Sequence, residues 1–275
     1  MSIIDELIVP FESVTLEKMD EVKLLNRMDT KFVFNAEKLP CILAQLYASY
    51  YILEIGLVRH HRYETLYFDT PGHHLYLNHH NKRMNRFKVR SRKYVDSGLC
   101  YFEIKFKNNK ERTLKERNKQ KGSQEEITGK QEHLLTSLTK LTADMLQPAL
   151  WVDFSRITLV NHGMTERVTI DTGLTFRNEA AERVYPGVVI AEVKQERSAS
   201  SAISAILHKE HVPGARISKY CLGIISLNPY IKQNNFKQKL HLINKLNHDI
   251  CETNHDVLPA VAPGPAGEGM HPAAN

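Results

Sequence analysis

The sequence has 275 residues, of which 42% are hydrophobic and 25% are charged, a balance typical of a soluble globular protein large enough for a sizeable core. The formal net charge of +6 favours an anionic partner such as a nucleotide, a polyphosphate, a nucleic acid or a membrane surface. No run of about 20 apolar residues exists, so we expect no transmembrane segment.

The cysteines and the N-terminus indicate neither a zinc site nor secretion. The four cysteines form no CxxC pair and have no histidine at zinc-finger spacing. The first residues, MSIIDELIVPFES, lack the basic and apolar regions of a signal peptide. We therefore expect a cytoplasmic protein with free thiols.

The first quarter of the chain is expected to alternate helices and strands. Apolar residues at helical spacing predict helices over 12–24 and 37–51. Enrichment in β-branched and aromatic residues predicts strands at the end of the segment 24–34 and over 62–69. In the first of these strands Lys31 points away from Phe32 and Phe34. The second strand stops at the turn 70–72, which reads Thr-Pro-Gly.

Two histidine doublets follow, His73-His74 and His79-His80. Adjacent residues of a strand or helix point apart, so neither doublet forms a ligand pair by itself. We do not interpret them as a metal site.

The stretch RFKVRSRKY, residues 86–94, predicts a strand with an unusual face. Because side chains alternate with period two, one face carries only cations: Arg86, Lys88, Arg90 and Arg92. After the turn 96–98, a second strand places Phe102, Ile104 and Phe106 on one face and charged residues on the other: Glu103, Lys105 and Lys107. Like charges repel across a sheet face, so a shared polyanion would make such rows favourable.

Residues 108–124 are basic and almost without apolar side chains. One interpretation is a solvated, mobile loop. The other is a flap that brings Arg112, Lys115 or Arg117 to an anion.

In the second half, the pattern predicts helices over 134–146 and 198–211. Between them it predicts strands over 152–159, 167–176 and 188–194. The strands carry Arg156, Arg167 and the pair Glu192 and Lys194. The last strand is otherwise apolar, and buried charges are costly unless paired or liganded.

We expect an α+β fold in which a closed antiparallel barrel forms a tunnel with helices packed outside. This unit would span 1–230, followed by a helical tail over 231–258 and a disordered Pro/Gly/Ala-rich tail over 259–275. Apolar strand faces would pack outward, and the charged faces would line the tunnel. The tunnel would hold Arg90, Arg92, Glu103, Lys105, Arg156, Arg167, Glu192 and Lys194.

The order of the charged motifs resembles the VTC domain, the polyphosphate polymerase branch of the triphosphate tunnel metalloenzymes. The resemblance covers about residues 10–230 and includes YFDT and IDTGLTF. Hydrolytic and cyclase members open with an ExExK strand, whereas this chain has NRMDTKF there, which fits the VTC branch. The motifs in chain order are Arg27 and Lys31, Arg90 and Arg92, Glu103 and Lys105, Lys115, Arg156, Arg167, Glu192 and Lys194, and Ser218-Lys219-Tyr220.

The resemblance implies transfer of the γ-phosphate of ATP to a growing polyphosphate chain inside the tunnel. It implies catalytic phosphate contacts by Lys31, Arg90, Arg92, Lys105, Arg156, Arg167 and Lys219. Further substrate contacts would come from Arg27, Lys88, Lys115 and Lys194. A divalent Mn²⁺ or Mg²⁺ would be held by Glu192, with help from Glu103.

Two alternatives remain open at this point. One is a metal-dependent triphosphatase in which water replaces the phosphate acceptor. The other is a non-catalytic polyphosphate-binding module. We do not expect nucleic acid as the partner, because Phe87, Phe102 and Phe106 lie on the strand faces opposite the cations. The oligomeric state is left open.

Overall fold

The computed structural model describes residues 2–20, 27–110, 112–122, 124–196 and 200–253. Its helices, 3-10 turns (η) and strands are, in chain order, α1 (Ile3–Leu7), β1 (Ser13–Val14), α2 (Leu16–Asp20), β2 (Arg27–Asn35), η1 (Ala36–Lys38), α3 (Leu39–Ala44), β3 (Tyr50–Leu53), β4 (His60–Asp69), α4 (His74–His80), β5 (Arg86–Tyr94), β6 (Leu99–Lys107), β7 (Thr113–Gln120), α5 (Lys130–Leu138), η2 (Ala143–Met145), β8 (Gln147–Asn161), β9 (Glu166–Arg177), β10 (Glu182–Tyr185), β11 (Val188–Glu196), α6 (Ala202–Lys209), α7 (Lys219–Leu227), η3 (Asn234–Phe236) and α8 (Lys237–Thr253).

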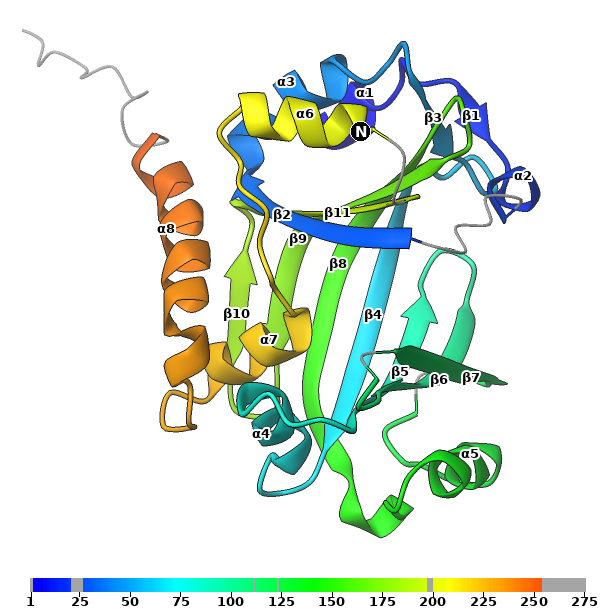
Figure 1. The fold of residues 1–275 in the computed structure, drawn as a ribbon, viewed down its shortest axis with the longest axis vertical. Coiled ribbons are helices and arrows are strands. Elements are labelled where there is room, and N and C mark those ends of the chain that lie inside the picture. Colours follow the sequence, from blue (N-terminus) through cyan, green and yellow to red (C-terminus); the bar gives the residue numbers. More distant parts are fainter. Residues whose placement is uncertain (1, 21–26, 111, 123, 197–199, 254–275) are drawn as a thin grey trace, which may run out of the picture.

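One antiparallel sheet organises the molecule, in the strand order β2-β11-β9-β8-β4-β5-β6-β7 (Figure 1). The short strands β10 and β3 pair with β9 and β8, and β1 pairs with β3. The predicted antiparallel α+β architecture is confirmed, but the barrel is not closed, because β2 and β7 do not pair within the described residues. Instead, the outer edge of β2 meets another segment through a Phe32–Gly214 bridge and the Ala215 N–H, which donates to the Lys31 carbonyl at 2.6 Å.

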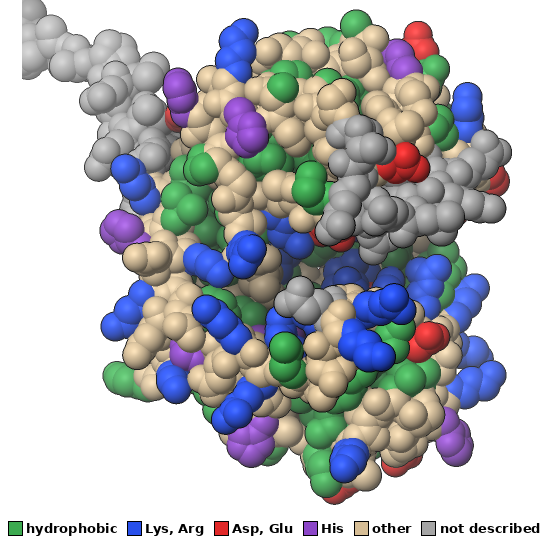
Figure 2. Space-filling view, in the orientation of Figure 1, with side chains coloured by type: hydrophobic (Ala, Val, Ile, Leu, Met, Phe, Trp, Pro, Cys, Tyr) green, Lys and Arg blue, Asp and Glu red, His purple; other side chains and the backbone are tan. Residues whose placement is uncertain are grey.

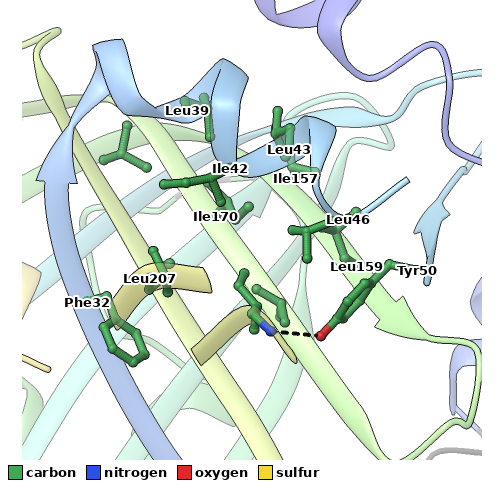
Figure 3. Packing of buried hydrophobic residues seen from close by; sticks show 14 of the residues in the cluster. Phe32, Leu39, Ile42, Leu43, Leu46, Tyr50, Ile157, Leu159, Ile170 and Leu207 are labelled. Carbon is green, nitrogen blue, oxygen red and sulfur yellow. Dashed lines mark hydrogen bonds between the residues drawn. The ribbon is translucent and has the colours of Figure 1, made fainter. Parts of the chain in front are cut away.

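The outward face of β2, β11, β9 and β8 is apolar and is covered by α1, α3 and α6. In Figure 3 Ile42, Leu43 and Leu46 lie over Ile157 and Ile170 of the sheet. The Tyr50 hydroxyl accepts the backbone N–H of Ile203 at 3.2 Å, which joins β3 to α6. A second apolar cluster covers the outward face of β4, β5 and β6 under α5, with Phe68, Val89, Phe102, Ile104 and Leu135 at its centre.

Helix α7 packs on the opposite, inward face of β8 and β9. Its residues Leu222 and Ile225 share a buried cluster with Leu150 and Phe176. The approach is close at Gly223, where an added Cβ would lie 2.6 Å from a Leu150 methyl carbon and 2.8 Å from the Phe176 ring. This part of the inward face is therefore filled by α7.

Several predicted elements have different bounds. The helix predicted over 12–24 begins as β1 and continues as the short α2, and 21–24 lie outside the described residues. The helix predicted over 37–51 ends at Ala44, and the helix predicted over 134–146 lies earlier, as α5. The basic stretch 108–124 contains strand β7 rather than only a loop.

The C-terminal helix α8 packs against the rest of the molecule. Ile243 is fully buried, and the Asn35 side chain donates to the Leu246 carbonyl at 2.9 Å. The predicted tail 259–275 lies outside the described residues. In the part of the chain that the structure describes, no helix is long and apolar enough to cross a membrane.

Candidate functional site

Strand register gathers the predicted cations on the inward side of the sheet, here called the basic face. Directly paired residues share a face, and the pairs include Lys31 with Glu192, Arg156 with Asp171, and Arg90 with Glu103. Figure 2 shows Lys and Arg side chains within a recess in the middle of the molecule and along its right side, over β5 to β7. The cations of the basic face are Lys31, Lys88, Arg90, Arg92, Lys105, Lys115, Arg156, Arg167, Lys194 and Lys219.

Glu103 is the centre of the first charged cluster and is fully buried. The Arg90 Nε donates to its carboxylate at 2.6 Å, and Lys115 from β7 forms an ion pair with the other oxygen. Burial alone would raise the pKa of Glu103, but Arg90, Arg92 and Lys115 outweigh it and hold the pKa at about 2. Both oxygens are thus engaged by cations, an arrangement that favours a role in positioning Arg90 and Lys115 over metal ligation.

A row of three lysines crosses the sheet beside this cluster. Lys105 of β6 pairs in register with Lys88 of β5 on one side and Lys115 of β7 on the other. Lys88 donates to the Ser218 hydroxyl at 2.8 Å, whereas Lys105 has no hydrogen bond or ion pair among the described residues. The positive charge of Arg90 has the largest effect on Lys105 and burial the next largest, and together they lower the pKa of Lys105 to about 6. An anion at this row would provide the missing counter-charge.

Asp171 forms the second cluster and was not among the predicted site residues. Its carboxylate accepts two bonds from the Arg156 guanidinium, at 2.6 and 2.8 Å, and an ion pair from Lys219 at the start of α7. Although burial opposes it, these two cations lower the pKa of Asp171. The sequence contained one signal, the period-two alternation that places Asp171 on the same face as Arg167.

Glu192 forms the third cluster, with Lys31 at 3.0 Å and Lys194 at 3.7 Å. Burial works to raise the pKa of Glu192, but the two lysines hold it at about 2, so the carboxylate is charged at neutral pH. Its side chain keeps 21% exposure, against none for Glu103.

The donor set fits a divalent cation only in part. Within the described residues, no group of three or more His, Cys, Asp or Glu side chains is placed to hold a metal. Mg²⁺ and Mn²⁺ accept one carboxylate when substrate phosphates supply further oxygens. Glu192 meets that requirement, because it is charged, partly accessible and on the basic face.

Aromatic rings also lie on the basic face, which the sequence analysis did not foresee. Tyr63 of β4 and Phe154 of β8 stack at 5.1 Å between ring centroids. The guanidinium groups of Arg92 and Arg156 lie 5.1 to 5.9 Å from these two rings, and the Lys219 ammonium lies 4.5 Å from Phe154. The faces of the rings form cation–π contacts with these side chains and restrict their orientation.

The first turn of α7 is tied to two other strands through the predicted SKY motif. Ser218 caps the helix by accepting from the Cys221 N–H. Tyr220 stacks on Tyr67 of β4 and donates its hydroxyl to Asp69 at 2.5 Å. The fully buried Asp69 also accepts backbone N–H groups from residues 70, 75 and 76, so one carboxylate fixes both α7 and the start of α4.

Two predicted contacts differ from the others. Arg167 donates to the Met19 carbonyl at 2.6 Å and lies 3.8 Å from Asp20, which places it under α2 at the margin of the basic face. Arg27 begins β2, but its side chain lies outside the described part of the chain.

The second histidine doublet, His79-His80, makes contacts that hold α4 in place. His79 Nε2 lies 3.0 Å from the Phe87 carbonyl, and burial lowers the pKa of His79 to about 3. His80 contacts Asn235 through its ring and its carbonyl. Both residues join α4 to neighbouring segments.

Several solved structures are similar to this chain at low identity. They include a candidate adenylate cyclase from Vibrio parahaemolyticus (10% identity, 73% of this chain and 99% of that chain, TM-score 0.43) and the PH1819 protein of Pyrococcus horikoshii (14%, 74% and 99%, 0.42). A third is the candidate adenylyl cyclase HpAC1 of Hippeastrum, described as having a dominant triphosphatase activity (13%, 73% and 95%, 0.40). No curated protein matches.

The family comparison is more informative. The VTC domain matches residues 26–228, which contain every predicted site residue and all strands of the described sheet except β1. The match covers well over half of the chain. The protein belongs to the VTC domain family.

Proposed function

We propose that this protein is a metal-dependent polyphosphate polymerase that transfers the γ-phosphate of ATP to a growing inorganic polyphosphate chain on the basic face. Membership of the VTC family supports this assignment. The observation that carries it is the charge imbalance of the basic face, where among the described residues the cations named above outnumber the carboxylates, which are Asp29, Glu103, Asp171, Glu192 and Glu196.

Such an imbalance is unfavourable without a bound polyanion, because like charges on one sheet face repel one another. Polyphosphate carries about one negative charge per unit along its length, so it neutralises a row of cations better than a compact anion does. Arginine forks bind phosphate oxygens in pairs, whereas lysine acts as a point charge. The basic face supplies both types.

The proposed transfer needs positioning and charge stabilisation rather than a protein nucleophile. A terminal oxygen of the acceptor chain attacks the γ-phosphorus of ATP, the bond to the β–γ bridging oxygen breaks, and ADP leaves. Arg90, Arg92 and Arg156 would orient phosphate oxygens, since Glu103 and Asp171 hold two of these guanidinium groups in place. A phosphate bound beside Lys105 would favour the protonated form of this lysine, which would then add positive charge to the site.

A Mn²⁺ or Mg²⁺ ion bound by Glu192 would neutralise charge on the transferred phosphate. Lys31 and Lys194 flank that carboxylate and keep it ionised. Glu103 would then act as a positioning residue for Arg90 and Lys115.

The test is incubation of the purified protein with ATP and Mn²⁺, following ADP, free phosphate and long-chain polyphosphate. Arg92→Ala and Glu192→Gln are the informative variants. Arg92 has no ion-pair partner among the described residues, so its removal leaves no buried carboxylate without a cation. Arg183→Ala, at an exposed arginine of β10, is the matched control.

We expect ADP and a polyphosphate ladder from the wild type and the control, and loss of both in the two variants. Free phosphate without a ladder would identify a triphosphatase instead. Polyphosphate binding without turnover of ATP would leave a binding module and refute the enzymatic assignment.

A further inference from the structure

Strand β7 presents three cations to solvent, and one of them, Lys115, belongs to the basic face described above. Lys115, Arg117 and Lys119 alternate with Leu114, Glu116 and Asn118 along the strand, and all three cations are exposed. Their register partners on β6 are Lys105, Glu103 and Tyr101, which lie on the basic face. The three β7 cations therefore extend the basic face to the edge of the sheet.

The extension is continuous across three strands. The nine inward positions of β5, β6 and β7 in these rows contain seven basic residues, one carboxylate and one tyrosine: Lys88, Arg90, Arg92, Lys105, Glu103, Tyr101, Lys115, Arg117 and Lys119. The β7 cations are exposed, whereas Arg90 and Glu103 in the same row are buried. A polyanion bound at Arg90 would thus find further cations on β6 and β7 toward solvent.

Two sides of the basic face are covered within the described residues. Helix α7 fills the inward face of β8 and β9, and the segment at Gly214 lies along the edge of β2. The outer edge of β7 has no strand partner in the described ranges. A chain longer than the basic face therefore has an open route over β7, as far as the described residues show.

The β7 surface suits polyphosphate better than single-stranded nucleic acid. Successive inward residues of a strand are about 6.6 to 6.8 Å apart, so the cations form a regular line of charge. Nucleic-acid grooves add exposed aromatic rings for stacking, and β7 contains none. The neighbouring Tyr101 is already covered by the Arg117 guanidinium, 4.7 Å from its centroid.

We propose that β7 is a docking surface for the part of a long polyphosphate chain that lies outside the catalytic recess, with Arg117 and Lys119 as its main contacts. This inference rests on the proposed function for the identity of the polymer. It adds a surface that selects for chain length, because only a chain that extends beyond the recess can use these two exposed side chains in addition to the recess.

The test compares ligands of two lengths in direct binding. Tripolyphosphate and long-chain polyphosphate are titrated calorimetrically against the wild type, Arg117→Gln/Lys119→Gln and the control Lys237→Gln/Lys245→Gln. The control removes the same charge from exposed positions of α8, on the opposite side of the molecule (Figure 1). All four substitutions are at exposed positions, and an unchanged melting temperature verifies folding.

We expect the β7 variant to lose affinity for the long chain while its affinity for tripolyphosphate stays within the range of the control. With about 0.7 counterions released per contact on a single-stranded polyanion, two lost contacts lower the salt slope by about 1.4. Between 50 and 200 mM salt, the wild type would then lose about sevenfold more affinity for the long chain than the variant does.

Three results would overturn the inference. Equal losses for both ligands would place Arg117 and Lys119 inside the recess, and no loss for either would remove β7 as a contact surface. Single-stranded RNA that binds more tightly than polyphosphate of equal charge, and loses that binding in the β7 variant, would make β7 a nucleic-acid surface. These readouts need no turnover, so a wild type that binds long chains through β7 but makes none would refute only the polymerase assignment.

Discussion

Replacing Asp171 by asparagine should destabilise the protein and loosen α7. The substitution keeps the size of the side chain but removes the negative charge that pairs with Arg156 and Lys219. The Asp171 side chain is 3% exposed, and those of its partners are 17% and 16% exposed. Two largely buried cations would be left without their carboxylate.

Removing one partner of a buried ion pair costs about 3 to 5 kcal/mol. Because water reaches both cations in part and the asparagine oxygen still accepts one bond, we expect the lower end, about 3 kcal/mol. At about 2 to 4 °C per kcal/mol for a protein of this size, the melting temperature should fall by about 6 to 12 °C. Tripolyphosphate should reduce the difference in melting temperature between the wild type and the variant, since a bound anion replaces the missing negative charge.

The pH dependence provides a second check. Arg156 and Lys219 hold the pKa of folded Asp171 below its unfolded value of about 3.9, so its stabilisation is present above pH 4 and is lost as the pH falls through the folded pKa. The difference in urea-unfolding free energy between wild type and Asp171→Asn should shrink in that acid range. A difference below about 1 kcal/mol at pH 7, the value of a surface pair, would refute the reasoning.

Three further substitutions test other parts of the site. Lys105→Met should raise the melting temperature at pH 7 and weaken tripolyphosphate binding. Between pH 6 and about 10.4 the Lys105 side chain is protonated in the unfolded state but not in the folded state, so the free energy of unfolding of the wild type should rise with pH in this window. The variant should not show this rise. Equal slopes of unfolding free energy against pH in the two proteins would contradict the lowered pKa of Lys105. Glu192→Gln should weaken Mn²⁺ binding in the presence of tripolyphosphate, measured by electron paramagnetic resonance, and unchanged binding would exclude Glu192 as a ligand. Gly223→Ala should destabilise by about 1 to 3 kcal/mol through contact with Leu150 and Phe176, whereas the same change in an unconstrained helix stabilises.

The faces of the basic strands could be predicted from sequence because strand geometry is strictly alternating. In β5 and β6 the inward cations and outward apolar residues are those expected from period two. Strand β7 was missed for the same physical reason, since TLKERNKQ has one apolar residue and no alternation to detect. An edge strand that is solvated on both sides carries no hydrophobic signal.

Partnerships across the sheet could not be predicted. Asp171 acquires its importance from Arg156, fifteen residues earlier, and from Lys219, forty-eight residues later, and only strand register and the docking of α7 bring the three together. The inward rings of Tyr63 and Phe154 look like ordinary core residues in sequence. Barrel closure is likewise a property of the first and last strands together, which no local pattern reports.

The buried Asp69 gives the YFDT motif a specific meaning. Its carboxylate gathers three backbone N–H groups and the hydroxyl of Tyr220, a residue 151 positions away, without reaching the recess itself. Asp69 therefore holds the start of α7 in place and so sets the position of Lys219, the residue next to Tyr220 in that helix. A substitution of Asp69 should therefore weaken any anion binding that depends on Lys219, although the Asp69 side chain itself is fully buried.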